Sequence, residues 1–235
     1  MSGALFPEAV FRIAGDRGIL VEYGDAIDLT VNHKVRAMAV VLDDDLPQGV
    51  MEVVPTYRSL LIVYDPAKTA PRQLKENLVS LEQRLPEIQI PPPKIVEIPV
   101  CYGGEFGPDI EFVAESHGLT VEEVVRLHTE PEYPIYMIGF TPGFPFLGGL
   151  PEILHTPRLE TPRTLVPAGS VGIANNQTGM YPVASPGGWQ LIGRTPLKLF
   201  APERSDPFLY QAGDRVKFQP ISPQEYSQLA KKEQL

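Results

Sequence analysis

A stretch rich in proline and glycine constrains this chain more than any other feature. Residues 131–200 contain 11 prolines, 10 glycines and no aspartate. Proline fixes φ and glycine permits positive φ, so a Pro-Gly pair favours a type II turn. We expect two such turns, one at Pro142-Gly143 and one at Pro186-Gly187. This Pro/Gly-rich stretch therefore predicts a rigid surface that is lined mainly by backbone.

The same composition without a sequence period is also typical of disordered chains. Here apolar side chains are interleaved with the prolines and glycines, and they supply the burial that disordered chains lack. They are Tyr136, Ile138, Phe140, Phe144, Phe146, Leu147, Val171, Ile173, Trp189, Leu191 and Leu199. From Tyr133 onward short apolar runs alternate with Pro/Gly turns, which predicts a closed or nearly closed β-barrel.

The length of 235 residues suits two domains of about 100 to 130 residues each. We expect an N-terminal α/β domain over 1–90, a stiff proline-rich linker over 91–94, and a β-barrel domain with a C-terminal helix over 95–235. No apolar run approaches the roughly 20 residues of a membrane span. The first residues also lack the basic region of a signal peptide, so we expect a cytoplasmic protein without membrane contact.

The first 90 residues alternate strand and helix patterns in the order ββαββα. Strands are expected at 11–14, 19–23, 50–54 and 60–64. Apolar residues recur at helical spacing in two places: Val31, Val35, Met38 and Leu42, then Leu74, Leu78, Leu81 and Leu85 before Pro86. Two helices on one face of an antiparallel sheet give a small, loosely ferredoxin-like domain within an α+β chain.

The second domain begins with a strand pattern over 94–100, and two short helices follow it. The first of these helices spans about 109–117. The second starts at Thr120, where Glu123 completes a capping box. A last helix begins at Ser222 with another capping box.

Charge limits the classes of partner. The net charge is −9, yet the Pro/Gly-rich stretch carries three acids and four bases. An acidic chain without any basic run argues against nucleic acid as a partner. The near-neutral stretch instead suits a small anionic ligand.

Catalytic signatures are weak. Residues 168–172, Ala-Gly-Ser-Val-Gly, nearly match the G-x-S-x-G elbow of hydrolases, but that elbow needs a helix after the serine. Here a strand pattern and a turn over 175–179 follow, so Ser170 is a poor candidate nucleophile. His155 lies in a loop of the Pro/Gly-rich stretch and is the better candidate acid or base. The catalytic residues therefore stay unknown.

Nucleotide and metal motifs are also missing. No Gly-Lys dipeptide occurs, which excludes a Walker A phosphate loop on this chain. Four dispersed histidines and a single cysteine give no metal-ligand spacing, so no metal site is expected. The stretch has no aspartate with which to build paired carboxylates. A partner chain that supplies catalytic groups would resolve this deficit.

Three arginines of the stretch have rigid neighbours. Arg158 and Arg163 each follow a proline, and Arg194 precedes Thr-Pro. Rigid neighbours lower the entropic cost of fixing a guanidinium, whose fork suits a carboxylate or phosphate. A hydrogen bond to a charged group contributes roughly 1.5 to 3 kcal/mol, enough for two arginines to dominate recognition of a small acid. The alternative is a structural ion pair with Glu152 or Glu160.

The motifs of the stretch closely resemble those of the 5-oxoprolinase B subunits. That family is also described as the KipI family, as allophanate hydrolase subunit 1, or as carboxyltransferase subdomains C and D. The resemblance covers the whole chain and is most specific after residue 130. The matching segments are 136–149, 157–158, 161–163, 166–172, 177–182 and 185–196.

The resemblance implies a cyclophilin-like β-barrel for the second domain and a small α/β domain before it. It implies one component of an ATP-binding hydrolase complex that opens 5-oxo-L-proline to L-glutamate, in direct contact with the C subunit and together with the A subunit. The chain alone would be inactive, and ATP would be used by the complex. No biotin attachment motif occurs on this chain. Two other roles stay open: inhibition of a histidine kinase, and biotin-dependent carboxyl transfer to urea or an amide.

The motif positions define the expected substrate site, next to the partner chain. We expect binding by Thr141, Gly143, Phe144, Arg158, Arg163, Gln177, Tyr181, Gly187, Gly188, Trp189 and Arg194. One or more of the arginines would grip the substrate carboxylate, and backbone amides near Gly143 and Gly187 would contact the lactam oxygen. For a kinase inhibitor, the aromatic surface over 140–146 would serve instead.

Overall fold

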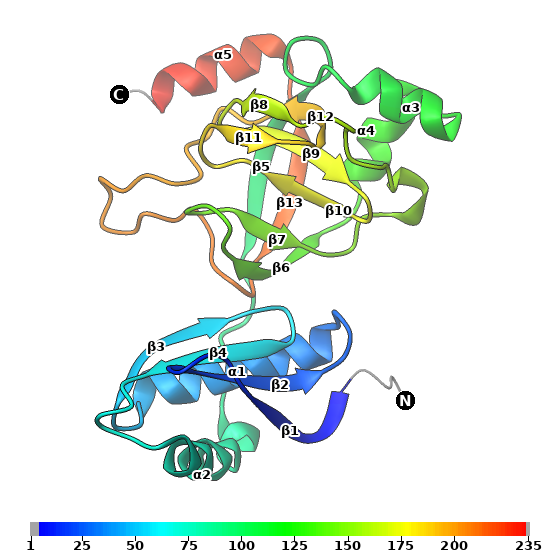
Figure 1. Ribbon diagram of the computed structural model, residues 1–235. Coiled ribbons are helices and arrows are strands. Elements are labelled where there is room, and N and C mark those ends of the chain that lie inside the picture. The colour runs from blue at the N-terminus through cyan, green and yellow to red at the C-terminus, as the bar shows by residue number, and fades with distance from the viewer. Residues whose placement is uncertain (1–4, 234–235) are drawn as a thin grey trace. The chain divides into compact units, whose positions relative to one another are not determined.

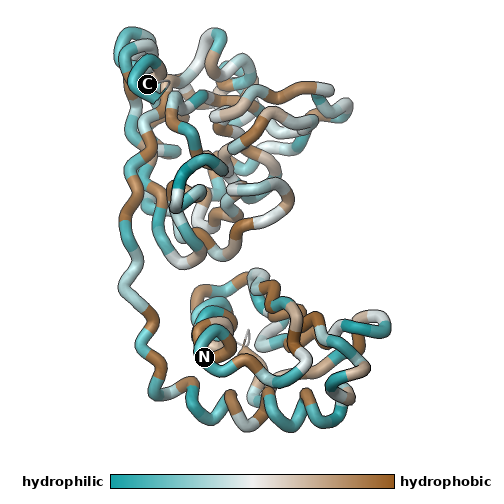
Figure 2. Tube along the Cα trace, turned by 90° about the vertical axis from the view of Figure 1, so that its left-hand side faces the viewer, coloured by the Kyte–Doolittle hydropathy of each residue, from teal (hydrophilic) through white to brown (hydrophobic). Residues whose placement is uncertain are grey.

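The computed structural model describes residues 5–233. The chain divides into two compact units, one ending at Pro92 and the other starting at Pro93. Each unit combines helices with a β-sheet (Figure 1). An extended, irregular segment over 88–94 connects the last turn of the first unit to the first strand of the second (Figure 2).

The N-terminal unit is a four-stranded antiparallel sheet with two helices. Its strands lie in the order β1-β2-β4-β3, so β1 and β3 form the two edges. Along the chain the elements run in the predicted order ββαββα. They are β1 (Leu5–Ile13), β2 (Gly18–Gly24), α1 (Leu29–Asp44), β3 (Val50–Pro55), β4 (Ser59–Tyr64) and α2 (Pro71–Glu82).

The predicted apolar stripe of α1 forms the core of this unit. Val31, Val35, Met38 and Leu42 are all buried, and they pack with inward residues of β2 and β4. Asp28 caps the helix because its carboxylate accepts hydrogen bonds from the first-turn amides. The sequence pattern therefore located both the helix and its buried face.

The second helix is shorter than its leucine spacing predicts. Leu74 and Leu78 are buried, but α2 ends at Glu82. Leu85 begins a separate 3₁₀ turn, η1 (Leu85–Glu87). Proline disfavours helical backbone at the residue before it, so Pro86 ends the helix earlier than an apolar period alone indicates.

The C-terminal unit is a seven-stranded sheet that is rolled into a nearly closed barrel. The strand order is β10-β9-β12-β5-β13-β6-β7, and the outermost strands β7 and β10 contact each other. Only the β5-β13 pair is parallel. The strands are β5 (Ile95–Tyr102), β6 (Tyr133–Ile138), β7 (Pro145–Leu147), β9 (Ser170–Ala174), β10 (Gln177–Met180), β12 (Gln190–Arg194) and β13 (Arg215–Pro220).

The mixed helix and strand content and the nearly closed barrel are thus confirmed. The finer ferredoxin-like and cyclophilin-like assignments stay predictions.

A separate two-stranded sheet, β8 (Arg163–Val166) with β11 (Ser185–Gly187), belongs to the same unit. Its helices are α3 (Ile110–His117), α4 (Val121–Thr129), the 3₁₀ turn η2 (Glu152–Leu154) and α5 (Pro223–Lys232). The capping boxes at Thr120 and Ser222 are both present, as predicted. Within residues 5–233 no helix combines the length and the apolar character needed to cross a membrane.

One of the two predicted Pro-Gly turns is present. The Phe144 amide donates to the Thr141 carbonyl at 3.0 Å, and Gly143 has a φ of 83°. The turn predicted at Pro186-Gly187 is wrong, because both residues lie in β11, paired with β8. Pro186 is exposed on this short strand, where a missing backbone donor is tolerated.

A buried histidine connects α4 to the barrel. His128 is fully buried and stacks on Phe218, with 4.6 Å between ring centroids. Because Thr178 gives its hydroxyl proton to the Gly172 carbonyl, it accepts from His128 Nε2 at 2.8 Å. His128 Nδ1 then accepts from the Tyr102 hydroxyl, also at 2.8 Å. Burial lowers the pKa of His128 from 6.5 to about 3, so the ring is neutral.

Replacing His128 by glutamine should flatten the dependence of stability on acidity. The pKa is about 3 in the folded chain and 6.5 in the unfolded chain, so the unfolded state binds more protons between these values. The free energy of unfolding therefore falls as the pH drops through this window. The fall per pH unit should be steeper in the wild type than in His128→Gln by about 1.4 kcal/mol. Glutamine keeps an N–H donor for Thr178.

Urea unfolding at about pH 7, 6 and 5 measures both slopes. Equal slopes for the two proteins would contradict a neutral, buried His128. A variant that is less stable at every pH but keeps the wild-type slope would also contradict it.

Candidate functional site

A pocket of about 170 Å³ lies in the C-terminal unit, among the strands and loops of the Pro/Gly-rich stretch. Seven of the eleven expected binding residues line it: Phe144, Arg158, Gln177, Tyr181, Gly187, Gly188 and Trp189. Phe140, Phe146 and Pro186 complete the lining. Segments that are up to about fifty residues apart in the sequence are therefore brought together by the fold around one cavity.

Aromatic rings build the floor of the pocket, and Phe144 is at their centre. It meets Trp189 edge to face, with 5.7 Å between centroids and 89° between planes. It meets Tyr181 in the same way at 5.8 Å and 79°, and Phe146 at 5.2 Å. Edge-to-face pairs are the favoured arrangement of aromatic rings, so these contacts fix the shape of the pocket before a ligand arrives.

Two glycines make room for these rings. A Cβ atom on Gly187 would overlap the Tyr181 hydroxyl. A Cβ atom on Gly179 would approach Trp189 at 3.1 Å and Phe144 at 3.3 Å. The rings can therefore pack directly on backbone: a side chain at position 187 would force Tyr181 to move, and one at position 179 would crowd Trp189 and Phe144.

The polar groups of the pocket are few. Arg158 is exposed at its rim, and no ion pair to Arg158 is found within residues 5–233. Burial raises the pKa of the Tyr181 hydroxyl, against a hydrogen bond from the Trp189 backbone and the positive charges of Arg158 and Arg163. The tyrosine is therefore protonated at neutral pH. The pocket thus offers an unpaired guanidinium beside a neutral phenol and apolar ring faces.

Arg163 lies behind the pocket rather than in its lining. Its Nη2 donates to both carboxylate oxygens of Asp109, at 2.6 and 2.8 Å, and its Nη1 donates to the Trp189 carbonyl at 3.2 Å. Asp109 accepts a third hydrogen bond from the Leu191 amide at 2.6 Å. The structural alternative for Arg163 is thus realised, with Asp109 as partner in place of Glu152 or Glu160. Arg163 supports the wall that carries Trp189.

Three other expected binding residues lie outside the lining. Thr141 and Gly143 form the turn that precedes Phe144, and the Gly143 carbonyl accepts from the Tyr210 hydroxyl at 2.8 Å. Arg194 pairs in register with Ser170 across β12 and β9, and its Nε is buried without a hydrogen-bond partner in the described chain. Among the three arginines, only Arg158 borders the cavity.

Neither weak catalytic candidate reaches the pocket. His155 Nε2 donates to the Leu150 carbonyl at 3.1 Å. Ser170 is completely buried, and the β9-β10 hairpin follows it where a hydrolase elbow needs a helix. Among residues 5–233 no three His, Cys, Asp or Glu side chains are grouped as metal ligands would be.

Asp109 is the residue that sequence reasoning missed. It was expected only as the start of a helix, and it does hold the N-cap position of α3, yet its carboxylate caps no amide of that helix. No sequence signal distinguished Asp109 from the glutamates of the stretch, Glu152 and Glu160, as the partner of Arg163.

Comparison with known proteins identifies the family of the chain. The sequence matches the family model of the carboxyltransferase domain, subdomain C and D, over residues 9–210. It is 47% identical over 226 residues to the 5-oxoprolinase B subunit of Bacillus subtilis (strain 168), with 90% of this chain and 92% of the relative covered. It is 42% identical over 208 residues to the 5-oxoprolinase B subunit of Escherichia coli O157:H7, with 88% and 94% covered.

A solved structure shows the same fold. The urea carboxylase of Kluyveromyces lactis matches 98% of this chain with a TM-score of 0.75, over 24% of its own length and at 24% identity. The chain therefore has the fold of a carboxyltransferase region. It belongs to the carboxyltransferase-domain family, subdomains C and D, and within it to the family of 5-oxoprolinase B subunits.

Replacing Asp109 by asparagine should destabilise the second unit and disturb the pocket wall. The change leaves the partly buried Arg163 guanidinium without its counter-charge, which we expect to cost about 2 to 3 kcal/mol of unfolding free energy. Trp189 is the one tryptophan of the chain, so its fluorescence reports on the pocket.

Urea unfolding and native-state emission of Asp109→Asn are the measurements. Glu111→Gln, on the exposed side of the same helix, is the control and should behave as wild type. If Asp109→Asn matches the wild type in both stability and emission, the ion pair does not support the pocket.

Proposed function

We propose that this chain acts as the B subunit of an ATP-dependent 5-oxoprolinase, a hydrolase complex that opens 5-oxo-L-proline to L-glutamate. One observation carries the proposal. Seven residues of the family motifs line a single pocket, in a chain that is 47% identical to a 5-oxoprolinase B subunit. The pocket is the place where the substrate would bind.

The chemistry of the pocket suits a small cyclic amide with one carboxylate. Arg158 presents a free guanidinium at the rim, and its fork matches a carboxylate. The flat lactam ring would lie among Phe144, Tyr181 and Trp189, whose faces are apolar. Backbone amides near Gly187 would then contact the lactam oxygen. Mostly apolar walls with a few polar groups are typical of small-ligand sites.

The reaction needs more than this chain supplies. Transfer of the terminal phosphoryl group of ATP to the lactam oxygen would turn that oxygen into a leaving group. Water would attack the lactam carbon, and the ring C–N bond would break with a proton passing to nitrogen, which leaves a glutamyl phosphate. A second water would hydrolyse this acyl phosphate to glutamate and free phosphate. No carboxylate or histidine lines the pocket within the described chain. The C subunit, in direct contact, and the A subunit would therefore provide the ATP site and the proton-transfer groups.

Reconstitution tests the assignment. Co-expression with the companion subunits should give a complex that releases ADP only when 5-oxoproline is present, with glutamate formed in equal amount. This chain alone should release none. ADP release that ignores 5-oxoproline, or full activity of a complex that lacks this chain, would contradict the proposal.

Replacing Arg158 by alanine in that complex should raise the KM for 5-oxoproline by about 10- to 100-fold, because one charge-assisted contact to the carboxylate is lost. The effect on kcat should be smaller, since the carboxylate does not react. Arg158→Lys should recover part of the loss. Arg126→Ala removes another exposed arginine, paired with Glu130 on α4, and should leave KM unchanged. Unchanged kinetics in Arg158→Ala would show that the substrate carboxylate is held elsewhere.

Inhibition of a histidine kinase is the second candidate, and one feature favours it. Phe140 is 74% exposed at the pocket rim and has a φ of 66°, which is unusual for a residue with a side chain. An exposed aromatic ring on a constrained loop is typical of a protein contact. Titration of the purified chain with a kinase dimerisation domain distinguishes kinase inhibition from the 5-oxoprolinase role. Saturable binding that is lost in Phe140→Ser would support kinase inhibition. Carboxyl transfer from a biotin protein is the third candidate.

A further inference from the structure

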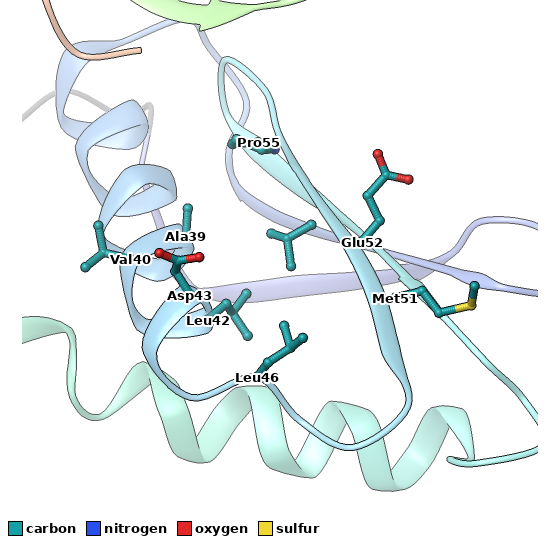
Figure 3. A pocket seen from close by; sticks show the side chains of 9 residues that line it. Ala39, Val40, Leu42, Asp43, Leu46, Met51, Glu52 and Pro55 are labelled. Carbon is teal, nitrogen blue, oxygen red and sulfur yellow. The ribbon is translucent and has the colours of Figure 1, made fainter. Parts of the chain in front are cut away.

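A second cavity, of about 500 Å³, lies in the N-terminal unit, far from any residue of the Pro/Gly-rich stretch in sequence. It is a groove between α1 and the edge strand β3 (Figure 3). Ala39, Val40 and Leu42 of α1 form one side, and Leu46 and Met51 form the other. Leu46 is 52% and Met51 63% exposed, so apolar surface is open to solvent there. Nothing in the proposed function uses this groove.

The strand beside the groove has a free edge. In the described part of the chain, β3 pairs with β4 alone, on one side. In an antiparallel strand alternate residues direct their N–H and C=O groups to the opposite side, so these groups of β3 face outward without a partner strand. An open edge is a template on which another extended segment can pair.

The groove is acidic. Asp43 on α1 and Glu52 on β3 both line it, and neither has an ion pair within residues 5–233. Asp43 extends from α1 toward β3, whereas Glu52 extends from β3 away from the helix (Figure 3). The last turn of α1 contains no basic residue, although a helix C-terminus favours cations. No lysine or arginine lines the groove within the described chain, and the nearby Arg84 is paired with Asp45, the C-cap residue of α1.

We propose that an extended segment of another protein, with apolar residues alternating with lysine or arginine, adds to β3 as a fifth strand. Side chains of a strand alternate between its two faces. One face of the added strand would bury apolar side chains against the exposed or partly exposed Val40 and Leu46. The other would present cations beside Glu52, and Asp43 would meet a cation at the rim. Main-chain hydrogen bonds would give affinity, and charge would give specificity.

Charge also excludes a second copy of this chain as the occupant. Antiparallel pairing of two β3 strands would bring two copies of Glu52 and of Asp43 into one interface, and like charges across a strand pair are destabilising. Pro55, at the end of β3, lacks a donor toward any added strand, so pairing would use the residues before it. A basic heterologous segment would place cations, and not like charges, beside Asp43 and Glu52.

A synthetic peptide of about eight residues, in which valine and lysine alternate, is the probe. Titrated into the full chain labelled with ¹⁵N, it should shift the amide resonances of β3 saturably and slow their hydrogen exchange. Binding should weaken as salt is added. A peptide with glutamate in place of lysine should bind at least about tenfold more weakly.

Charge-reversed variants provide the matched test. The double change Asp43→Lys and Glu52→Lys should invert the preference, so that the glutamate peptide binds and the lysine peptide does not. Asp25→Lys reverses an exposed acid just before α1, outside the groove, and should bind as the wild type does. The proposal is overturned if β3 amides do not respond, or if Asp25→Lys weakens binding as much as the double variant. It is also overturned if β3 becomes protected on raising the protein concentration without peptide, which would identify a second copy as the occupant.

Discussion

The ion pair between Arg163 and Asp109 holds together the part of the structure on which the pocket depends. Arg163 starts β8, Asp109 precedes α3, and the same carboxylate binds the Leu191 amide at the start of β12. Arg163 also binds the Trp189 carbonyl. The side chains of Arg163 and Asp109 thus join β8, the start of α3 and β12 to one another and to Trp189, which forms one wall of the pocket. Asp109 accepts three hydrogen bonds, two of them from Arg163 Nη2, so removing either partner would leave a partly buried charge without its counter-charge.

The pocket that this pair supports is preformed rather than induced. Its rings contact one another edge to face, and they lie directly on glycine backbone at positions 179 and 187. A site of this kind binds a small rigid molecule with little loss of conformational entropy. Its polar side chains are one guanidinium, one neutral phenol and the Gln177 amide, and no carboxylate or histidine lines it within the described chain. The chemistry of the chain therefore agrees with a family whose named members are subunits.

The two units divide the work that one component of a complex must do. The C-terminal unit contains the pocket, and the buried Tyr102-His128-Thr178 network keeps its barrel and α4 in fixed register. The N-terminal unit exposes a free strand edge, that of β3, beside an acidic, apolar groove. The proposed small-molecule site and the proposed strand-addition site thus lie on different units.

The sequence by itself determined the elements and most of the pocket residues. Helix stripes, capping boxes and the Pro142-Gly143 turn depend on neighbours within a few residues, so local patterns located them. The family motifs then marked seven residues that do line one cavity. Only the tertiary structure decided between conformations or contacts that the local sequence allows equally well. Arg163 could bind a ligand or a carboxylate of the chain. The fold brings Asp109, which is distant in sequence, next to it, so Arg163 forms an ion pair within the chain. Pro186-Gly187 could turn or extend, and pairing with β8 made it a strand. Long-range pairing supplies free energy that no local pattern contains, which is why these outcomes could not be read from the sequence.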